Sequence, residues 1–327
     1  MDHTSTQTIP EQSKSANQQF CDDVLAGLTA MPKHLDSKYF YDTAGDKLFQ
    51  QIMACDEYYP TECEMEIFTR QTADIAEVLK GDGSPFNLIE LGAGDATKSV
   101  NLLRELLNSG TDFTYMPIDI SPNVISQLED TLPKALPSLQ IEGFPGEYFN
   151  MLKKAASANG KRNVVLFLGS NIGNMPVSDA DFFCKLLHAH LSSGDMVFIG
   201  FDLKKNPKVI LAAYNDSQGI TKQFNLNLLT RINRELGADF DLPKFEHYPI
   251  YDPETGSCRS YLFSLVEQQV NICDESISFA KNELIYMEVS QKYSVDEVKE
   301  MATKANFTSV TDFYDSRGWF LDTIWVV

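Results

Sequence analysis

The chain has 327 residues, of which 43% are hydrophobic, and it carries a formal net charge of -19. That length suffices for one large or two moderate domains with a substantial core. The negative charge disfavours nucleic acids and anionic membranes as partners, because both bind basic surfaces. The sequence shows no apolar leader and no apolar run long enough to span a bilayer, so we expect a cytoplasmic protein. The six cysteines lack CxxC spacing, which predicts reduced thiols in such a protein.

The N-terminal quarter of the chain precedes any regular alternation of strands and helices. Residues 1–14 are polar and are predicted to be disordered. A helix is predicted over residues 16–30, and an aromatic segment follows over residues 38–60. A further helix is predicted over residues 62–80, before a Gly-Asp-Gly-Ser-Pro linker.

From residue 87 onward, strands and helices alternate. Strands are predicted over residues 87–91, 113–120, 139–144, 163–169 and 195–203, and helices over residues 97–108, 122–132, 147–158 and 179–191. Such alternation predicts an α/β fold with a parallel sheet, helices on both faces, and ligands at the carboxyl ends of the strands.

The pattern changes after residue 203. Helices are predicted over residues 207–216, 222–236 and 294–305, and strands over residues 246–251, 257–266, 269–272, 283–293, 308–313 and 323–327. The last two strands are expected to close the sheet as a hairpin. We therefore assign residues 15–60, 81–203 and 293–327 to the sheet domain, and residues 61–80 and 204–292 to an inserted α+β substrate-binding domain.

The segment LIELGAGDATKS, residues 88–99, combines a buried strand, a glycine turn and a helix start. Gly92 and Gly94 let the backbone turn sharply or approach a ligand closely. The turn lacks the third glycine of the dinucleotide fingerprint and the ending of a phosphate loop, which disfavours a diphosphate ligand. Asp119 ends the next predicted strand, where its carboxylate can accept hydrogen bonds from two ribose hydroxyls. These features predict a nucleoside-type cofactor, although a strand-to-helix turn and a helix cap are the alternatives.

Two later loops carry further polar candidates. Glu147 and Tyr148 follow the third strand and could contact the amino group and face of an adenine, or simply begin a helix. The fourth strand ends in a small polar loop, residues 169–174, which is predicted to face the cofactor through Ser170 and a substrate amine or carboxylate through Asn174. Asparagine there could instead be a capping or turn residue. The five strands fit a seven-stranded S-adenosylmethionine-dependent methyltransferase as well as a dehydrogenase.

Several long motifs decide between these classes. They are Tyr41-Asp42-x-x-Gly45 with Leu48-Phe49, Glu57-Tyr58-Tyr59-Pro60-Thr61, Glu90-Leu91-Gly92-x-Gly94, Leu168-Gly169-Ser170 with Ile172-Gly173-Asn174, Ala213-Tyr214-Asn215-Asp216, and Phe224-Asn225 through Asn233-Arg234-Glu235-Leu236. With these motifs the chain, from about Leu35 to Tyr293, resembles the histidine-specific Nα-methyltransferase family of ergothioneine biosynthesis.

The resemblance implies a Rossmann-like class I methyltransferase sheet and S-adenosylmethionine as the cofactor. It implies methylation of the α-amine of L-histidine, up to the trimethylated product hercynine. The residues that it places at the cofactor are Gly92, Gly94, Lys98, Asp119, Glu147 and Tyr148. It places Tyr58, Asn174 and Tyr214 at the amine and carboxylate of the amino acid, Tyr41 near the reacting nitrogen, and Glu288 with Ser290 at the imidazole. Of these, Tyr41 and Asn174 are the predicted catalytic residues.

Some features leave the substrate open. Ser260 stands where actinobacterial members of the family carry a methionine, which puts the shape of the substrate pocket in doubt. A ring-modified histidine such as thiohistidine, or another aromatic amino acid such as tryptophan, is therefore an alternative substrate. A non-catalytic sensor of the cofactor or amino acid is a further hypothesis. A nicotinamide dehydrogenase is disfavoured, because no proton-relay residues are found. We expect a monomer that acts on a small-molecule amino acid and uses no metal ion.

Overall fold

The computed structural model describes residues 16–327, so the disorder predicted for residues 1–14 lies outside the described residues. The chain divides into two compact units. Unit 1 contains the residues up to Ile52 together with Gln218–Pro249 and Arg259–Glu288. Unit 2 contains Met53–Ser217, Ile250–Cys258 and Val289–Val327.

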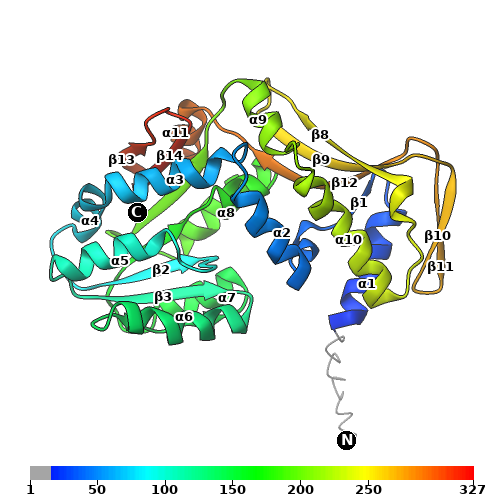
Figure 1. Cartoon of the computed structure of the whole chain (residues 1–327). Helices are drawn as coiled ribbons and strands as arrows, with labels where there is room; N and C mark the ends of the chain where they lie inside the picture. Colours follow the sequence, from blue (N-terminus) through cyan, green and yellow to red (C-terminus); the bar gives the residue numbers. More distant parts are fainter. Residues whose placement is uncertain (1–15) are drawn as a thin grey trace, which may run out of the picture. The chain divides into compact units, whose positions relative to one another are not determined.

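Unit 2 is built on a mostly parallel sheet (Figure 1). Its strands are β2 (Phe86–Leu91), β3 (Phe113–Asp119), β4 (Gln140–Ile141), β5 (Phe144–Pro145), β6 (Arg162–Phe167), β7 (Met196–Asp202), β13 (Thr308–Tyr314) and β14 (Phe320–Val326). Their order is β13-β14-β7-β6-β2-β3-β4, and β5 also pairs with β3. Within this sheet β14 alone runs opposite to the other strands, because it pairs antiparallel with both β7 and β13. The predicted parallel sheet and closing hairpin are therefore confirmed.

The predicted third strand is interrupted in the structure. In place of one strand over residues 139–144, β4 and β5 pair with successive parts of β3. Between them the backbone N–H of Gly143 donates a hydrogen bond to the Glu129 carboxylate at 2.9 Å, which takes it out of the ladder. Because β4 and β5 share one position, the eight strands fill the seven positions that were predicted.

Helices cover both faces of this sheet. They are α3 (Tyr59–Arg70), α4 (Thr72–Lys80), α5 (Ser99–Asn108), α6 (Pro122–Ala135), α7 (Tyr148–Ala156), α8 (Val177–Ala189), α9 (Pro207–Ala213) and α11 (Val295–Lys304). Leu88 packs in the core cluster that includes α3 to α6, whereas Ile89 packs in the cluster that includes α7, α8 and α11. Successive residues of β2 thus face opposite helix layers, and Figure 1 shows α5 and α7 on opposite sides of β2.

The helix predicted over residues 62–80 is two helices in the structure. Gln71 ends α3 and begins α4, with a backbone φ of -120° and ψ of 12° that is not helical. Its side-chain amide donates to the carbonyl of Tyr314 at 2.8 Å, which anchors the break to β13. Both helices belong to unit 2, whereas the sequence analysis assigned residues 61–80 to the substrate-binding domain and residues 15–60 to the sheet domain.

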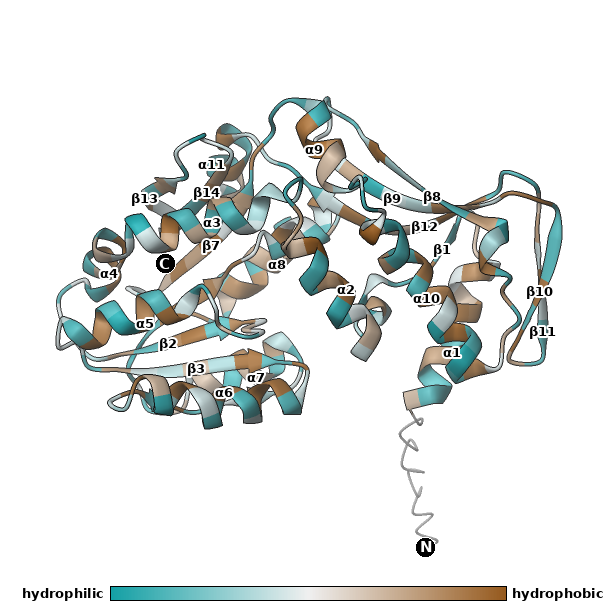
Figure 2. Ribbon diagram, in the orientation of Figure 1, coloured by the Kyte–Doolittle hydropathy of each residue, from teal (hydrophilic) through white to brown (hydrophobic). Residues whose placement is uncertain are grey.

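Unit 1 combines helices with a smaller sheet. Its helices are α1 (Ala16–Thr29), most of α2 (Thr43–Met53) and α10 (Ile220–Leu236). Most of a sheet with the order β1-β12-β9-β8 belongs to it, from β1 (Lys33–His34), β12 (Leu284–Gln291), β9 (Ser257–Ser264) and β8 (Phe245–Tyr251). Residues 250–251 of β8, 257–258 of β9 and 289–291 of β12 belong to unit 2. A separate hairpin joins β10 (Gln268–Ile272) to β11 (Glu275–Phe279). Neither β1 nor β11 was predicted from the sequence. Figure 2 shows hydrophilic and hydrophobic residues on each helix, as expected for helices with one buried face.

The expectation of six reduced thiols is wrong for one pair of cysteines. Cys21 of α1 and Cys273 of the β10–β11 turn form a disulfide with a Cα–Cα distance of 6.5 Å. The two residues are 252 positions apart, so their spacing in the sequence carries no information about their proximity. The other four cysteines are buried free thiols. None of the described helices combines the length and apolar character needed to cross a membrane.

Candidate functional site

The glycine turn after β2 is held in a shape that only glycine adopts readily. Gly92 has a φ of +71°, and its N–H donates to the carbonyl of Ile118 at 2.8 Å. A Cβ on Gly92 would lie 2.7 Å from the Tyr148 hydroxyl. Gly94 has a φ of +54°, and a Cβ there would have no described atom within 4 Å. The turn therefore borders open space in which a ligand can approach the backbone closely.

Asp119 is fixed by hydrogen bonds from the loops that follow β2 and β3. Its carboxylate accepts hydrogen bonds from the N–H of Gly94 at 3.3 Å and from the N–H of Ser121 at 2.9 Å. A carboxylate has about four acceptor positions, so these two contacts leave capacity for further donors such as ribose hydroxyls. The predicted acceptor at the end of the second strand is thus oriented beside the glycine turn.

Glu147 and Tyr148 lie next to Asp119 because β5 pairs with the end of β3. Asp119 is the register partner of Pro145, and its carbonyl accepts the Gly146 N–H at 2.8 Å. Tyr148 packs edge-on against Phe167, and burial raises the pKa of its hydroxyl to about 12. Glu147 is exposed. Three predicted cofactor-contacting segments therefore meet at the carboxyl ends of β2, β3 and β5.

Glu90, just before the turn, is part of the support for the strand. It is buried and accepts hydrogen bonds from Ser99 at 2.5 Å and from Tyr115 at 2.6 Å. Burial raises the pKa of this carboxyl, against the effect of the two donors. The side chain ties β2 to α5 and β3, so its role in the structure is to hold the turn in place.

Lys98 forms an ion pair with Glu64, a residue that the sequence analysis did not identify. Glu64 is 1% exposed, and its other oxygen accepts the Gly169 N–H at 2.7 Å. Burial disfavours the charge on Lys98, but the Glu64 carboxylate outweighs this and raises the pKa of Lys98. Asp322 lies beside the pair, and burial followed by repulsion from Glu64 raises its pKa well above the usual range. No sequence motif marks Glu64 or Asp322.

The loop after β6 contacts the end of β7 and the end of β12. Ser170 has a φ of +54°, and its hydroxyl accepts the Asp202 N–H at 3.0 Å. The short helix η2 (Asn171–Asn174) follows and ends at Asn174, which is exposed. A Cβ on Gly173 would lie 2.7 Å from the backbone oxygen of Gln291, so this loop lies directly against the end of β12.

Three of the predicted substrate-binding residues lie together in unit 2. The rings of Tyr58 and Tyr214 are 6.1 Å apart in an edge-to-face arrangement. The Tyr214 hydroxyl donates a hydrogen bond to Ser290 at 2.7 Å. Behind them lie Lys292 and Asp202, which the sequence analysis missed. No signal in the sequence marks them, because a charged residue at the end of a strand is common and the two residues are 90 positions apart.

Three further residues predicted at the substrate belong to unit 1, whereas Asn174 is in unit 2. Tyr41 is 46% exposed and packs edge-on against Phe49 and Phe224. Ser260 is buried on β9, and Glu288 is half-buried on β12, the neighbouring strand in the sheet. The structure therefore divides the predicted substrate residues between the two units.

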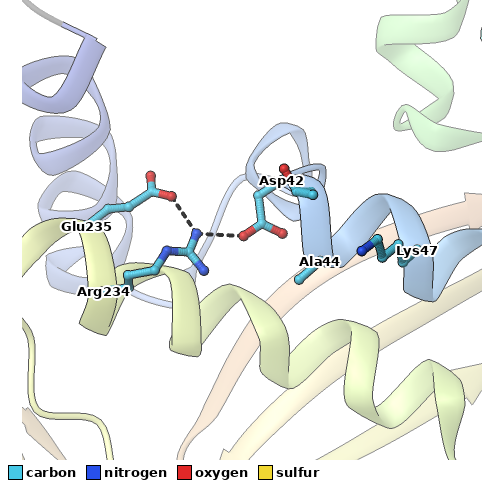
Figure 3. Close-up of a pocket in the computed structure, with 6 residues that line it drawn as sticks. Asp42, Ala44, Lys47, Arg234 and Glu235 are labelled. Atoms are coloured by element: carbon cyan, nitrogen blue, oxygen red, sulfur yellow. Dashed lines mark hydrogen bonds and ion pairs between the residues drawn. The ribbon is translucent and has the colours of Figure 1, made fainter.

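The residues that follow Tyr41 in the sequence line one side of a pocket of about 430 Å³ (Figure 3). It is lined by Asp42, Thr43, Ala44, Lys47, Arg234 and Glu235. The Arg234 guanidinium contacts both Asp42 and Glu235 at 2.6 Å, so its charge is balanced within the pocket. Asp42 also accepts hydrogen bonds from the Gly45 N–H at 2.7 Å and from the Asn227 amide at 2.9 Å. These contacts attach the segment that carries Tyr41 to α10.

The strand order and the turn define the class of protein. Three features together characterise a class I methyltransferase. They are an antiparallel strand between the last parallel strand and the edge strand, a glycine turn after the first strand, and an acid after the second strand. The turn suits S-adenosylmethionine, because Gly94 faces open space and Asp119 retains acceptor capacity. When bound, this cofactor supplies an electrophilic methyl group.

The chain belongs to the family of histidine-specific, S-adenosylmethionine-dependent methyltransferases, whose model matches residues 20–327. It is 33% identical over 300 residues to histidine N-alpha-methyltransferase of Mycolicibacterium smegmatis, covering 91% of this chain and 92% of that protein. It is 29% identical over 292 residues to ergothioneine biosynthesis protein 1 of Schizosaccharomyces pombe, covering 85% of this chain and 37% of that protein. It is also 29% identical over 227 residues to 4-dimethylallyltryptophan N-methyltransferase of Epichloe festucae var. lolii, covering 65% of this chain and 63% of that protein. The chain is therefore an S-adenosylmethionine-dependent methyltransferase.

Proposed function

We propose that this enzyme transfers methyl groups to the α-amino nitrogen of L-histidine, up to the trimethylated product. The observation that carries the proposal is the pairing of Glu288 and Ser290 on β12, two residues apart and therefore on one face of the strand. A carboxylate and a hydroxyl at this spacing offer partners to both nitrogens of an imidazole. The family and the mycobacterial relative support the same substrate.

The chemistry requires little of the protein beyond placement. Methyl transfer from a sulfonium is an in-line displacement, so the enzyme needs a neutral amine and a near-attack geometry. In the proposal Tyr58, Asn174 and Tyr214 hold the amine and carboxylate of the amino acid, and Tyr41 lies near the reacting nitrogen. Lys98, Glu147, Tyr148 and Ser170 complete the cofactor site around Gly92, Gly94 and Asp119. We further propose that the enzyme acts as a cytoplasmic monomer without a nucleic-acid partner.

A second candidate substrate is an aromatic amino acid other than histidine. Ser260 is small and 2% exposed, and it stands in place of the methionine expected from actinobacterial relatives, so the smaller side chain at this position favours a larger ring. The similarity to a fungal enzyme that acts on a tryptophan derivative favours the same alternative. Thiohistidine, an imidazole with one added sulfur, is the conservative version of this candidate.

Mass spectrometry of a mixed reaction tests the proposal. The purified chain is incubated with S-adenosylmethionine, the standard amino acids and thiohistidine. We expect successive methylation of histidine alone. Glu288→Gln should lower kcat/KM for histidine by about tenfold to a hundredfold, because a hydrogen bond to a charged group contributes about 1.5–3 kcal/mol.

Glu283→Gln is the matched control. Glu283 directly precedes β12 and pairs with Lys33 at 2.6 Å, so its loss should leave kcat/KM for histidine unchanged. Methylation of another amino acid would assign the choice of substrate to Ser260 in place of Glu288. Cofactor binding by calorimetry without methylation of any amino acid would refute the enzymatic proposal in favour of a sensor.

A further inference from the structure

A buried ionic cluster lies at the carboxyl end of β7. Asp202, the last residue of the strand, is fully buried, and its carboxylate pairs with two lysines. Lys292 contacts one carboxylate oxygen at 2.6 Å and is 1% exposed, while Lys205 contacts the other. Tyr59 donates to the same carboxylate at 2.8 Å. Burial of this kind fixes side chains strongly, because an unpaired charge in the interior is costly.

The two lysines differ in what else they bind. Lys205 donates to the Tyr59 hydroxyl at 3.0 Å and to the carbonyl of Leu203 at 2.5 Å. Lys292 instead donates to the Tyr214 hydroxyl at 2.7 Å and to the Ser290 hydroxyl at 2.9 Å. Only Lys292 therefore connects Asp202 to residues of the proposed substrate site.

Counting protons fixes the direction of each hydrogen bond around Lys292. An ammonium group has three donors and no acceptor, so its contacts with Asp202, Tyr214 and Ser290 use all three. Because the Tyr214 oxygen accepts from Lys292, its own proton is directed to Ser290, 2.7 Å away. The Ser290 oxygen thus accepts two hydrogen bonds.

A serine hydroxyl has two lone pairs and one proton. With both lone pairs of Ser290 occupied, any further hydrogen bond that it makes must be one in which it donates. We propose that Lys292 is a positioning residue that makes Ser290 an obligate hydrogen-bond donor, so that the enzyme selects a substrate ring with an unprotonated nitrogen at that position. This inference rests on the proposed function and adds to it the protonation pattern of the ring.

The consequence concerns which rings are accepted. A neutral imidazole has one N–H and one acceptor nitrogen, which match Glu288 as an acceptor and Ser290 as a donor. A pyrrole or an indole has an N–H only, so a ring of either kind leaves the Ser290 proton facing carbon. Leaving a buried polar group unpaired is costly, so the network discriminates against such rings.

The test compares histidine with the two pyrrolylalanines, pyrrol-2-yl- and pyrrol-3-yl-alanine. Each has a carbon in place of one ring nitrogen and retains the size of the imidazole. For the wild type, kcat/KM for both analogues should be lower than for histidine by about tenfold or more, the effect of about one lost hydrogen bond. In Lys292→Met, Ser290 is no longer forced to donate. The ratio of kcat/KM for histidine to kcat/KM for the analogue that retains the Glu288 contact should therefore fall to about threefold or less.

Lys205→Met is the matched control, because it removes the other buried lysine of the same carboxylate without touching Tyr214 or Ser290. It should lower stability in a similar way but keep the ring preference. Lys292→Arg, which retains donors and charge, should restore part of the preference. Calorimetric binding of S-adenosylmethionine reports whether each variant is folded.

The outcomes separate this inference from the proposed function. Absence of histidine methylation by the wild type refutes the proposed function itself. Efficient methylation of histidine and of both pyrrolylalanines by the wild type overturns the donor role of Ser290, and this comparison requires no variant. A folded Lys292→Met that keeps the full ring preference, or a Lys205→Met that loses it equally, overturns the role of Lys292.

Discussion

Glu64 and Lys98 form an ion pair between α3 and the start of α5, next to the loops that are predicted to hold the cofactor. Glu64 is 1% exposed and the Lys98 side chain 24%. Because the second oxygen of Glu64 accepts the N–H of Gly169, one carboxylate joins α3 to the segments that follow β2 and β6. The loops at the carboxyl ends of these strands are thus held by a helix that precedes the sheet in the chain.

Removing the charge of Glu64 should loosen both loops. In Glu64→Gln the amide can still face Gly169 but leaves Lys98 without its counter-ion. We expect the free energy of unfolding to fall by about 2 kcal/mol, less than for a fully buried pair because Lys98 is partly exposed. The affinity for S-adenosylmethionine should fall by about tenfold. Denaturant titration and calorimetry measure these effects, and Glu62→Gln, at an exposed position of the same helix, should show neither.

Asp322 should make stability depend on pH in an unusual direction. Burial and the nearby Glu64 raise its pKa well above 3.8, and neither carboxyl oxygen has a hydrogen-bond partner in the described part of the chain. The fold therefore keeps a proton that the unfolded chain releases, so this group costs stability as pH rises from 3.8 toward the folded pKa. Asn cannot ionise. As pH rises from about 4 to about 7, the free energy of unfolding of Asp322→Asn should therefore increase by about 1 kcal/mol or more relative to that of the wild type.

Chemical denaturation at several pH values measures this gain. Asp130→Asn serves as the control, because Asp130 is exposed on α6 and pairs only at the surface with Lys134. Its effect should not vary with pH in the same range. A constant difference between Asp322→Asn and the wild type would show that Asp322 ionises normally.

Gly92→Ala should damage the cofactor site more than an alanine at another left-handed glycine. At Gly92 the added Cβ meets both a φ of +71° and the Tyr148 hydroxyl at 2.7 Å. At Gly110 the φ is +69°, but no described atom lies within 4 Å. Both substitutions should cost about 1 kcal/mol through backbone strain. Only Gly92→Ala should also lower the affinity for S-adenosylmethionine, by about tenfold or more, in a calorimetric titration.

The parallel sheet was predictable because its signals are local. The apolar run before Gly92, the glycines themselves and the acid at the end of the second strand each reflect a requirement of one short segment. The break at Gln71 was not predictable, because it depends on a hydrogen bond to Tyr314, 243 positions away.

The buried polar network around the site was beyond sequence analysis for the same reason. Asp202 and Lys292 are 90 positions apart, and each alone is typical of a charged residue at a strand end. Their ion pair becomes visible only when the sheet brings them within 2.6 Å. The motifs identified Tyr214 and Ser290, but not the lysine that orders their hydroxyl groups.

The segment of Tyr41 gives a final prediction in unit 1. Asp42 accepts hydrogen bonds from Gly45, Asn227 and Arg234, whereas Arg234 is half exposed and contributes only one of these contacts. The Arg234 contact holds the pKa of Asp42 below its usual range, against burial, and the Gly45 and Asn227 contacts act in the same direction. Asp42→Ala should therefore lower the free energy of unfolding by about 2 kcal/mol, and Arg234→Ala by less than about 1 kcal/mol.

The same two variants separate the position of Tyr41 from cofactor binding. Because Asp42 holds the turn that presents Tyr41, Asp42→Ala should lower kcat for methyl transfer by about tenfold or more. The affinity for S-adenosylmethionine should not change, since the residues assigned to the cofactor belong to unit 2. Single-turnover kinetics and calorimetry on both variants measure the two effects. A parallel loss of activity in Arg234→Ala would instead assign the effect to the exposed ion pair, and an unchanged kcat in Asp42→Ala would remove Tyr41 from the reaction.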